Sequence, residues 1–170
     1  MPFMALYIEE LGVKGDMVEL YAGLSVAISA LASALVSPIW GRLADRYGRK
    51  PMMIRASMVM TFTMGGLALV PNVFWLLFLR TLNGLFAGYV PNATALIASQ
   101  VPQNRSGYAL GTLSTGLTAG VLIGPLLGGT LSEAFGMRGT FLLVGLILFI
   151  CCLLTIFGLR EDFQPVEKGE

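Results

Sequence analysis

The sequence has no histidine, only two cysteines and few charged residues, which make up 12% of its 170 residues. Without histidine the chain has few ligands for a metal, and a net charge of +1 provides no basic surface for nucleic acid. Cys151 and Cys152 are adjacent, too close for a structural disulfide, and their redox role stays open. Nucleotide-binding loops, catalytic triads and metal-ligand spacings are also absent. We therefore expect no enzyme, no cofactor and no nucleic-acid partner.

Apolar residues dominate what is present: 55% of the chain is hydrophobic, and its mean hydropathy is +0.76. A soluble domain usually carries about 25% charged residues, so the composition predicts a membrane protein. Uncharged stretches long enough to cross a bilayer predict an all-α helical bundle embedded in lipid. The expected spans are 20–41, 51–70, 73–100, 107–131 and 139–159, with the end of an earlier span within 1–13 and a polar tail at 161–170.

Basic residues are divided unequally between alternate connections of these spans. One side has Arg42, Arg46, Arg49, Lys50, Arg55, Arg105, Arg160 and Lys168, and the other has Lys14 and Arg138. Because basic residues concentrate in cytoplasmic loops, this bias places the connection 41–50 and the C-terminus in the cytoplasm.

The stretch Gly111–Gly129 contains no charge and has glycines at every fourth position. These glycines are Gly116, Gly120, Gly124 and Gly128. On a helix they form a stripe without side chains, where a second backbone can approach closely. Pro125 removes a backbone donor, so we expect a bend beside the stripe. The repeat alone also fits general packing between membrane helices.

The connection 41–50, GRLADRYGRK, is the densest cluster of charge. Gly41 and Gly48 allow the chain to leave and re-enter helices tightly, and Asp45 can cap a helix or pair with an arginine. The bases that follow can hold the next helix at the lipid headgroups. The cluster could carry a specific role, or it could serve only to set the topology.

Arg80 lies inside an apolar span, about 12 Å from the turn at Asn72. An arginine at this depth costs about 2.5–3.5 kcal/mol on insertion scales, so a functional role is the default hypothesis. The alternative is a side chain that snorkels to the interface.

Further features of the same span concern packing and a candidate substrate site. Gly84 and Gly88 predict a close helix crossing, and Pro91 predicts a kink. Three polar residues could face a central cavity or could hydrogen-bond neighbouring helices: Tyr89, Asn92 and Thr94. The aromatic residues near the expected interfaces fit an interfacial belt: Trp40, Phe74 and Trp75.

The connection 41–50 resembles the loop between the second and third helices of the major facilitator superfamily. The match covers the characteristic glycines, acid and bases: Gly41, Asp45, Arg46, Gly48, Arg49 and Lys50. In that family the loop is a conformational latch whose contacts differ between outward-open and inward-open states. The resemblance implies the same role here, with Asp45 and Arg49 as its main members.

Two further stretches resemble motifs of that family. The segment 76–84 is similar to the fourth-helix motif, whose arginine is implicated in proton coupling, although Asn83 and Phe86 depart from the usual residues. This implies a coupling role for Arg80. The glycine-rich stretch resembles the fifth-helix signature of drug and proton antiporters, which in the family packs on the second helix and shapes a pivot and leak barrier. It matches at Gly111, Gly120, Gly124, Pro125, Gly128 and Gly129.

Together these motifs imply the N-terminal six-helix half of a bacterial multidrug efflux protein, which exchanges small amphiphilic drugs for protons across the cytoplasmic membrane. We expect the chain to be a fragment, inactive alone, that lacks the first helix and the C-terminal half of the transporter. Two alternatives stay open. One is a small membrane protein that self-associates through its glycine stripe without transport, and the other is part of a proton-coupled metabolite symporter.

Overall fold

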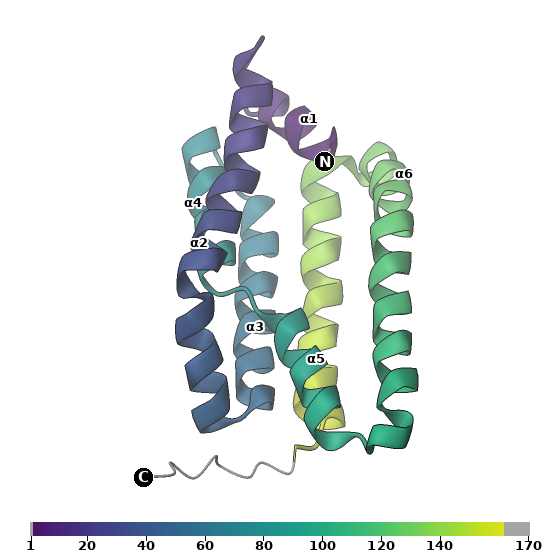
Figure 1. Ribbon diagram of the computed structural model, residues 1–170. Helices are drawn as coiled ribbons and strands as arrows, with labels where there is room; N and C mark the ends of the chain where they lie inside the picture. Colours follow the sequence, from purple (N-terminus) through teal and green to yellow (C-terminus); the bar gives the residue numbers. More distant parts are fainter. Residues whose placement is uncertain (1, 162–170) are drawn as a thin grey trace.

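The computed structural model describes residues 2–161, and the regular elements in this range are all helices (Figure 1). They are α1 (Pro2–Glu10), α2 (Met17–Tyr47), α3 (Arg49–Leu67), α4 (Val73–Leu85), α5 (Tyr89–Gln100) and α6 (Gln103–Gly158). The helix α6 is two antiparallel limbs, because Gly136 adopts φ 71° and ψ 170°, a conformation that glycine tolerates without strain. We call residues 103–135 the first limb and residues 137–158 the second limb.

The long helices run side by side, as Figure 1 shows, with α2 and the first limb of α6 on opposite sides of the bundle. The helix α3 and the second limb pack against each other between them. The short α1 lies across one end, near the turn at Gly136, and the second limb ends at the other. The predicted helical bundle is therefore confirmed.

The surface of this bundle fits lipid. Three stretches of the described residues are long and apolar enough to cross a membrane: Met17–Tyr47, Val73–Gln100 and Gln103–Gly158. Large apolar side chains point outward along the first limb, where Val121 is 74% exposed and Leu126 is 72% exposed. Such a surface would drive aggregation in water but is ordinary against acyl chains.

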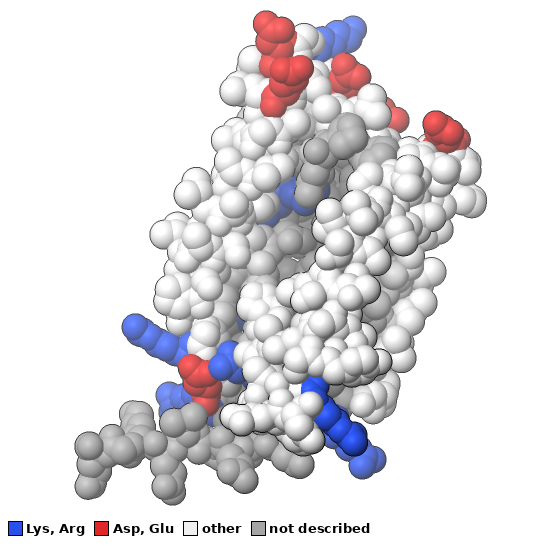
Figure 2. All heavy atoms as spheres, turned by 45° about the vertical axis from the view of Figure 1, so that its right-hand side comes forward, with Lys and Arg blue, Asp and Glu red and all other residues white. Residues whose placement is uncertain are grey.

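Charges are sorted along the bundle (Figure 2). Most acidic side chains gather at the end that holds α1, whereas most basic side chains gather at the opposite end, near the junction of α2 and α3. This distribution agrees with the predicted orientation, in which the junction of α2 and α3 faces the cytoplasm.

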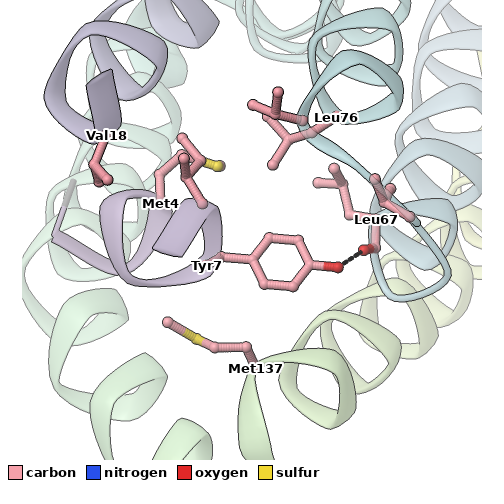
Figure 3. Packing of buried hydrophobic residues seen from close by; sticks show 9 residues of the cluster. Met4, Tyr7, Val18, Leu67, Leu76 and Met137 are labelled. Carbon is pink, nitrogen blue, oxygen red and sulfur yellow. Dashed lines mark hydrogen bonds between the residues drawn. The ribbon is translucent and has the colours of Figure 1, made fainter. Parts of the chain in front are cut away.

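Tyr7 of α1 is the centre of the larger apolar cluster (Figure 3). Its side chain is fully buried, its ring lies 5.0 Å from that of Phe141, and its hydroxyl donates to the carbonyl of Leu67. Leu67 lies in the last turn of α3, where carbonyls lack helical partners. Tyr7 therefore provides a hydrogen-bond donor to the C-terminal end of α3 and fills the space between α3, α4 and α6.

Two close helix crossings depend on glycine. A Cβ on Gly84 of α4 would collide with the backbone of Ser29 in α2, with 2.9 Å to both the Cα and the carbonyl carbon. The crossing predicted at Gly84 is thus present. A second crossing, which the sequence did not reveal, brings Gly145 of the second limb against Gly65 of α3, where a Cβ on Gly145 would lie 3.1 Å from the amide nitrogen of Gly65.

The connection predicted at 41–50 is almost entirely helical. The helix α2 continues to Tyr47 and α3 begins at Arg49, so the junction is reduced to Gly48, with φ 99°. The expected tight exit at Gly41 is wrong, because the residues that follow it are mostly good helix formers and continue the helix. Gly48 makes the turn alone.

The span predicted at 73–100 is interrupted. Asn72 caps α4 as its side chain accepts from the amide of Trp75 at 3.2 Å, which confirms the predicted turn. The helix then ends at Leu85, and α5 begins after Gly88, whose φ is 129°. Pro91 lies in the first turn of α5, so the kink expected from it takes the form of a full break just before the proline. The crossing expected at Gly88 is wrong, because a Cβ there would meet only the side chain of Asn92.

Candidate functional site

Five of the six residues predicted to form a conformational latch lie at the junction of α2 and α3, and Gly41 lies farther back in α2. Arg49 pairs with Asp45 at 2.5 Å across Gly48, and Lys50 donates to the carbonyl of Leu159 at 2.5 Å. Arg46 lies over the ring of Tyr47, 5.4 Å from its centroid. An exposed pair such as Asp45 and Arg49 contributes about 0–1 kcal/mol, so its contact can form and break without unfolding the bundle.

Glu161 completes this junction from the far end of the chain. Its two carboxylate oxygens accept the backbone N–H groups of Arg49 and Lys50, each at 2.7 Å. These are the first N–H groups of α3, which have no helical partner, and a carboxylate also matches the positive end of the helix dipole. Gly48 has no side chain to cap them, so Glu161 supplies the cap.

Sequence reasoning missed Glu161 because it assigned this residue to a polar tail. The only local signal was an acid two residues after a long apolar span, and its partners lie more than a hundred positions earlier. The rest of that predicted tail, 162–170, lies outside the described residues.

Replacement of Glu161 by alanine is expected to destabilise the bundle by about 1–2 kcal/mol, because it removes both hydrogen bonds of the α3 cap. The measurement is thermal unfolding of the purified protein in detergent. Glu133→Ala is the matched control, because Glu133 is an acid at the other end of the bundle. Equal stability of the two variants would contradict the capping role.

Arg80 points into the bundle rather than along its surface. Its Nη2 lies 3.9 Å from the sulfur of the buried Met4, and its Nε is buried without a hydrogen-bond partner. Its carbonyl accepts from the hydroxyl of Ser29 at 2.8 Å. Within residues 2–161 no carboxylate lies within salt-bridge distance of Arg80. The charge is therefore held in the interior without a local counter-ion, which is expensive in a membrane protein.

The three polar residues of α5 make hydrogen bonds to helices. The Thr155 hydroxyl donates to the Cys151 carbonyl at 2.8 Å, so Tyr89 is the donor in its 2.9 Å contact with Thr155. This bond joins α5 to the second limb of α6. The buried Asn92 donates to the carbonyl of Gly88 at 2.7 Å, and the exposed Thr94 bonds within its own helix. Their substrate role stays a prediction.

Four glycines of the antiporter-type stretch have no packing partner among the described residues. An added Cβ would meet no atom within 4 Å at Gly111, Gly116, Gly120 and Gly124. Because the first limb and α2 lie on opposite sides of the bundle (Figure 1), the expected packing of this stretch on the second helix is wrong. Pro125 lies inside the limb without interrupting it, and Gly128 and Gly129 follow in the same helix.

Another face of the first limb borders a hollow of about 410 Å³. The hollow is lined by Ser114, Thr115, Thr118, Ala119 and Leu122. The hydroxyls of Thr115 and Thr118 donate to carbonyls of their own helix at 2.8 and 2.9 Å. The hollow therefore presents methyl groups and hydroxyl oxygens with no charge among the lining residues.

The structure thus brings Asp45, Arg49 and Lys50 together with Glu161. Arg80 and the glycine-rich limb form separate regions of the bundle.

Comparison with known proteins gives matches along the whole chain. The sequence profile described as Major Facilitator Superfamily matches residues 1–170. The multi-drug resistance efflux pump PmrA of Streptococcus pneumoniae is 64% identical over 167 residues, which cover 98% of this chain and 42% of PmrA. Its homolog in Lactococcus lactis is 62% identical, and the multidrug resistance protein MdtG of Dickeya zeae is 52% identical, with 100% and 99% of this chain covered. The chain spans about two fifths of the length of each relative.

Proposed function

Because the chain belongs to the major facilitator superfamily, we propose that it works in a transporter that expels small amphiphilic compounds in exchange for protons. The chain is a multi-pass protein of the bacterial cytoplasmic membrane. The observation that carries the proposal is the match of nearly the whole chain, at 64% identity, to a protein described as a multi-drug resistance efflux pump.

The proposed transport cycle is alternating access, in which two helical bundles rock around a site near the middle of the membrane. In this cycle the weak pair of Asp45 and Arg49 forms and breaks at the cytoplasmic end, beside the cap that Glu161 places on α3. Arg80 provides a fixed positive charge in the interior, which favours release of a proton from any acid that approaches it. Residues 2–161 hold no such acid beside Arg80, so the proton carrier comes from elsewhere in the transporter.

The open hollow beside the first limb supports the proposed substrate class. Its lining is apolar apart from hydroxyl groups, and such a surface favours compounds with large apolar parts over small, highly charged metabolites. Tyr89, Asn92 and Thr94 remain the candidate polar contacts, with Tyr89 free to exchange its bond to Thr155 for one to substrate.

The glycine face of the first limb is proposed to pack against the remaining half of the transporter. The relatives are more than twice the length of this chain, and an open stripe of small residues is the surface on which a membrane helix packs closely. The same open face is the observation that favours the alternative, a protein that self-associates through this stripe.

A chimaera tests the proposal. This chain replaces the matched region of PmrA, and the chimaera is expressed in cells that lack their own drug pumps. We expect lower steady-state accumulation of ethidium than in cells with an empty vector, and a protonophore should abolish the difference. Unchanged accumulation by a stably inserted chimaera would contradict efflux, and greater accumulation would favour uptake and the symporter.

The chain expressed by itself is the companion experiment. We expect no dye efflux from it, because one bundle provides only one side of an alternating-access pathway. Cysteine cross-linking at Gly120→Cys shows whether the glycine face packs against the remaining half of the transporter or against a second copy of this chain. Cross-linked dimers of the chain at this position, together with an inactive chimaera, would favour the self-associating protein.

A further inference from the structure

The break between α4 and α5 leaves three consecutive carbonyls without a backbone N–H partner inside an apolar span. They are the carbonyls of Leu85, Phe86 and Ala87. Pro91 offers no N–H to the carbonyl of Ala87, four residues earlier. Backbone carbonyls within a membrane need hydrogen-bond partners from the protein, because lipid provides none.

Two side chains from other helices supply these partners. Trp40 of α2 donates its indole N–H to the carbonyl of Leu85 at 2.7 Å. Arg55 of α3 directs one guanidinium nitrogen at the carbonyls of Phe86 and Ala87, each at 3.4 Å. The guanidinium also stacks on Trp40, with its carbon 3.3 Å from the ring centroid, which is a cation–π contact.

This role differs from what the sequence suggested for both residues. Trp40 fitted the interfacial aromatic belt, and Arg55 counted among the charges of a cytoplasmic connection. The structure places Arg55 seven residues into α3, about 9 Å beyond its first residue. Its Nε and Nη1 are buried without hydrogen-bond partners, and within residues 2–161 no carboxylate pairs with it. An apolar side chain would fill this space at lower cost, so the donor geometry is what Arg55 contributes.

The two helices on either side of the break share α3 as a neighbour and differ in their second neighbour. The helix α4 packs on α2, through the contact of Gly84 with Ser29 and the bond from Ser29 to the carbonyl of Arg80, and Asn83 also bonds it to Thr63 of α3. The helix α5 packs on α3 and on the second limb of α6, through the apolar cluster of Met53 with Leu96 and the bond from Tyr89 to Thr155. Of the long helices, α2 thus packs on α4 and the second limb packs on α5, so a shift of α2 relative to the second limb changes the angle between α4 and α5 at the break.

We propose that the break at residues 86–88 is a hinge and that Arg55 and Trp40 are positioning residues that clamp it. The clamp joins α2 to α3 and satisfies the open carbonyls, so it fixes the angle between α4, which carries Arg80, and α5, which carries Tyr89. The link to transport rests on the proposed function, whereas the clamp itself is a property of the fold and is measured separately.

Hydrogen–deuterium exchange of the protein in lipid nanodiscs tests the clamp. We compare the wild type with Arg55→Met and with Trp40→Phe, a milder change that keeps an aromatic ring and removes the indole N–H. Arg105→Met is the control, since Arg105 is an exposed base outside the clamp. We expect the amides of residues 86–90 and 92–94 to exchange about tenfold faster in Arg55→Met and to a smaller extent in Trp40→Phe, with α2 unchanged. Arg55→Lys, which keeps the charge but loses the planar fork, should lie between the wild type and Arg55→Met.

Unchanged exchange at residues 86–94 in both variants would overturn the clamp. If Arg55→Met fails to insert, Trp40→Phe alone decides the question. Dye efflux by the chimaera provides the second readout, where we expect Trp40→Phe to lower the maximal rate with little change in the half-saturating dye concentration. Faster exchange without efflux by the unmodified chimaera would support the clamp and contradict the proposed function. Normal efflux by the unmodified chimaera, with unchanged exchange in the variants, would support the proposed function and contradict the clamp.

Discussion

Replacing Gly84 with alanine is expected to destabilise the bundle by about 3 kcal/mol, at the upper end of the usual cost of overpacking. The added methyl group would overlap the backbone of Ser29, whose Cα and carbonyl carbon lie 2.9 Å from the Cβ position. A backbone atom cannot move aside as a flexible side chain can, so α2 and α4 must separate. That separation also breaks the hydrogen bond from Ser29 to the carbonyl of Arg80.

Gly23→Ala is the matched control, because Gly23 is a glycine within α2 whose Cβ would meet no atom within 4 Å. It should leave stability unchanged or raise it by up to about 1 kcal/mol through helix propensity. The measurement is thermal unfolding of both variants in the same detergent. Similar midpoints for Gly84→Ala and Gly23→Ala would show that α2 and α4 do not cross as closely as the structure has them.

Replacing Arg80 with methionine is expected to abolish proton-driven efflux while leaving the protein as stable as before, or more stable by about 1–3 kcal/mol. The guanidinium is held in the interior with its Nε unpartnered, so its removal relieves a cost of burial. Methionine fills a similar volume beside Met4. Loss of function together with retained or increased stability is the pattern expected of a residue kept for its charge.

The readouts are dye efflux by the chimaera and the unfolding midpoint of the same variant. Arg80→Lys keeps a positive charge at this position and should retain part of the efflux, which separates the charge from the shape of the side chain. Full efflux by Arg80→Met would rule out the coupling role. A much lower unfolding midpoint for Arg80→Met would instead show that Arg80 stabilises the packing of the bundle.

Much of the bundle could be predicted because membrane spans depend on local features, namely apolar length and turn residues. The turn at Asn72 and the turn near Gly136 follow from such signals. The break after Leu85 could not be predicted from Pro91 alone, because its carbonyls are satisfied by Trp40 and Arg55 from other helices. The continuation of α2 through Gly41 likewise reflects the context of the whole junction rather than one residue.

Glycine patterns in the sequence also do not identify which helix packs against a glycine. Spacing marked the Gly120 stripe as a packing surface, yet a Cβ there would meet nothing within 4 Å, whereas the isolated Gly145 contacts the backbone of Gly65. A sequence shows where a close approach is permitted, but the partner depends on how the helices are arranged. Glu161 illustrates this for charge, because its role as the α3 cap depends on the return of α6 to the end of the bundle where α3 begins.

The most direct test of proton-driven efflux is to reconstitute the chimaera in proteoliposomes and impose a pH gradient, acidic on the side that corresponds to the outside of the cell. We expect dye to move toward the acidic side while protons move the other way, and both movements should disappear in Arg80→Met. Dye movement that is independent of the gradient, or in the same direction as the protons, would contradict the account.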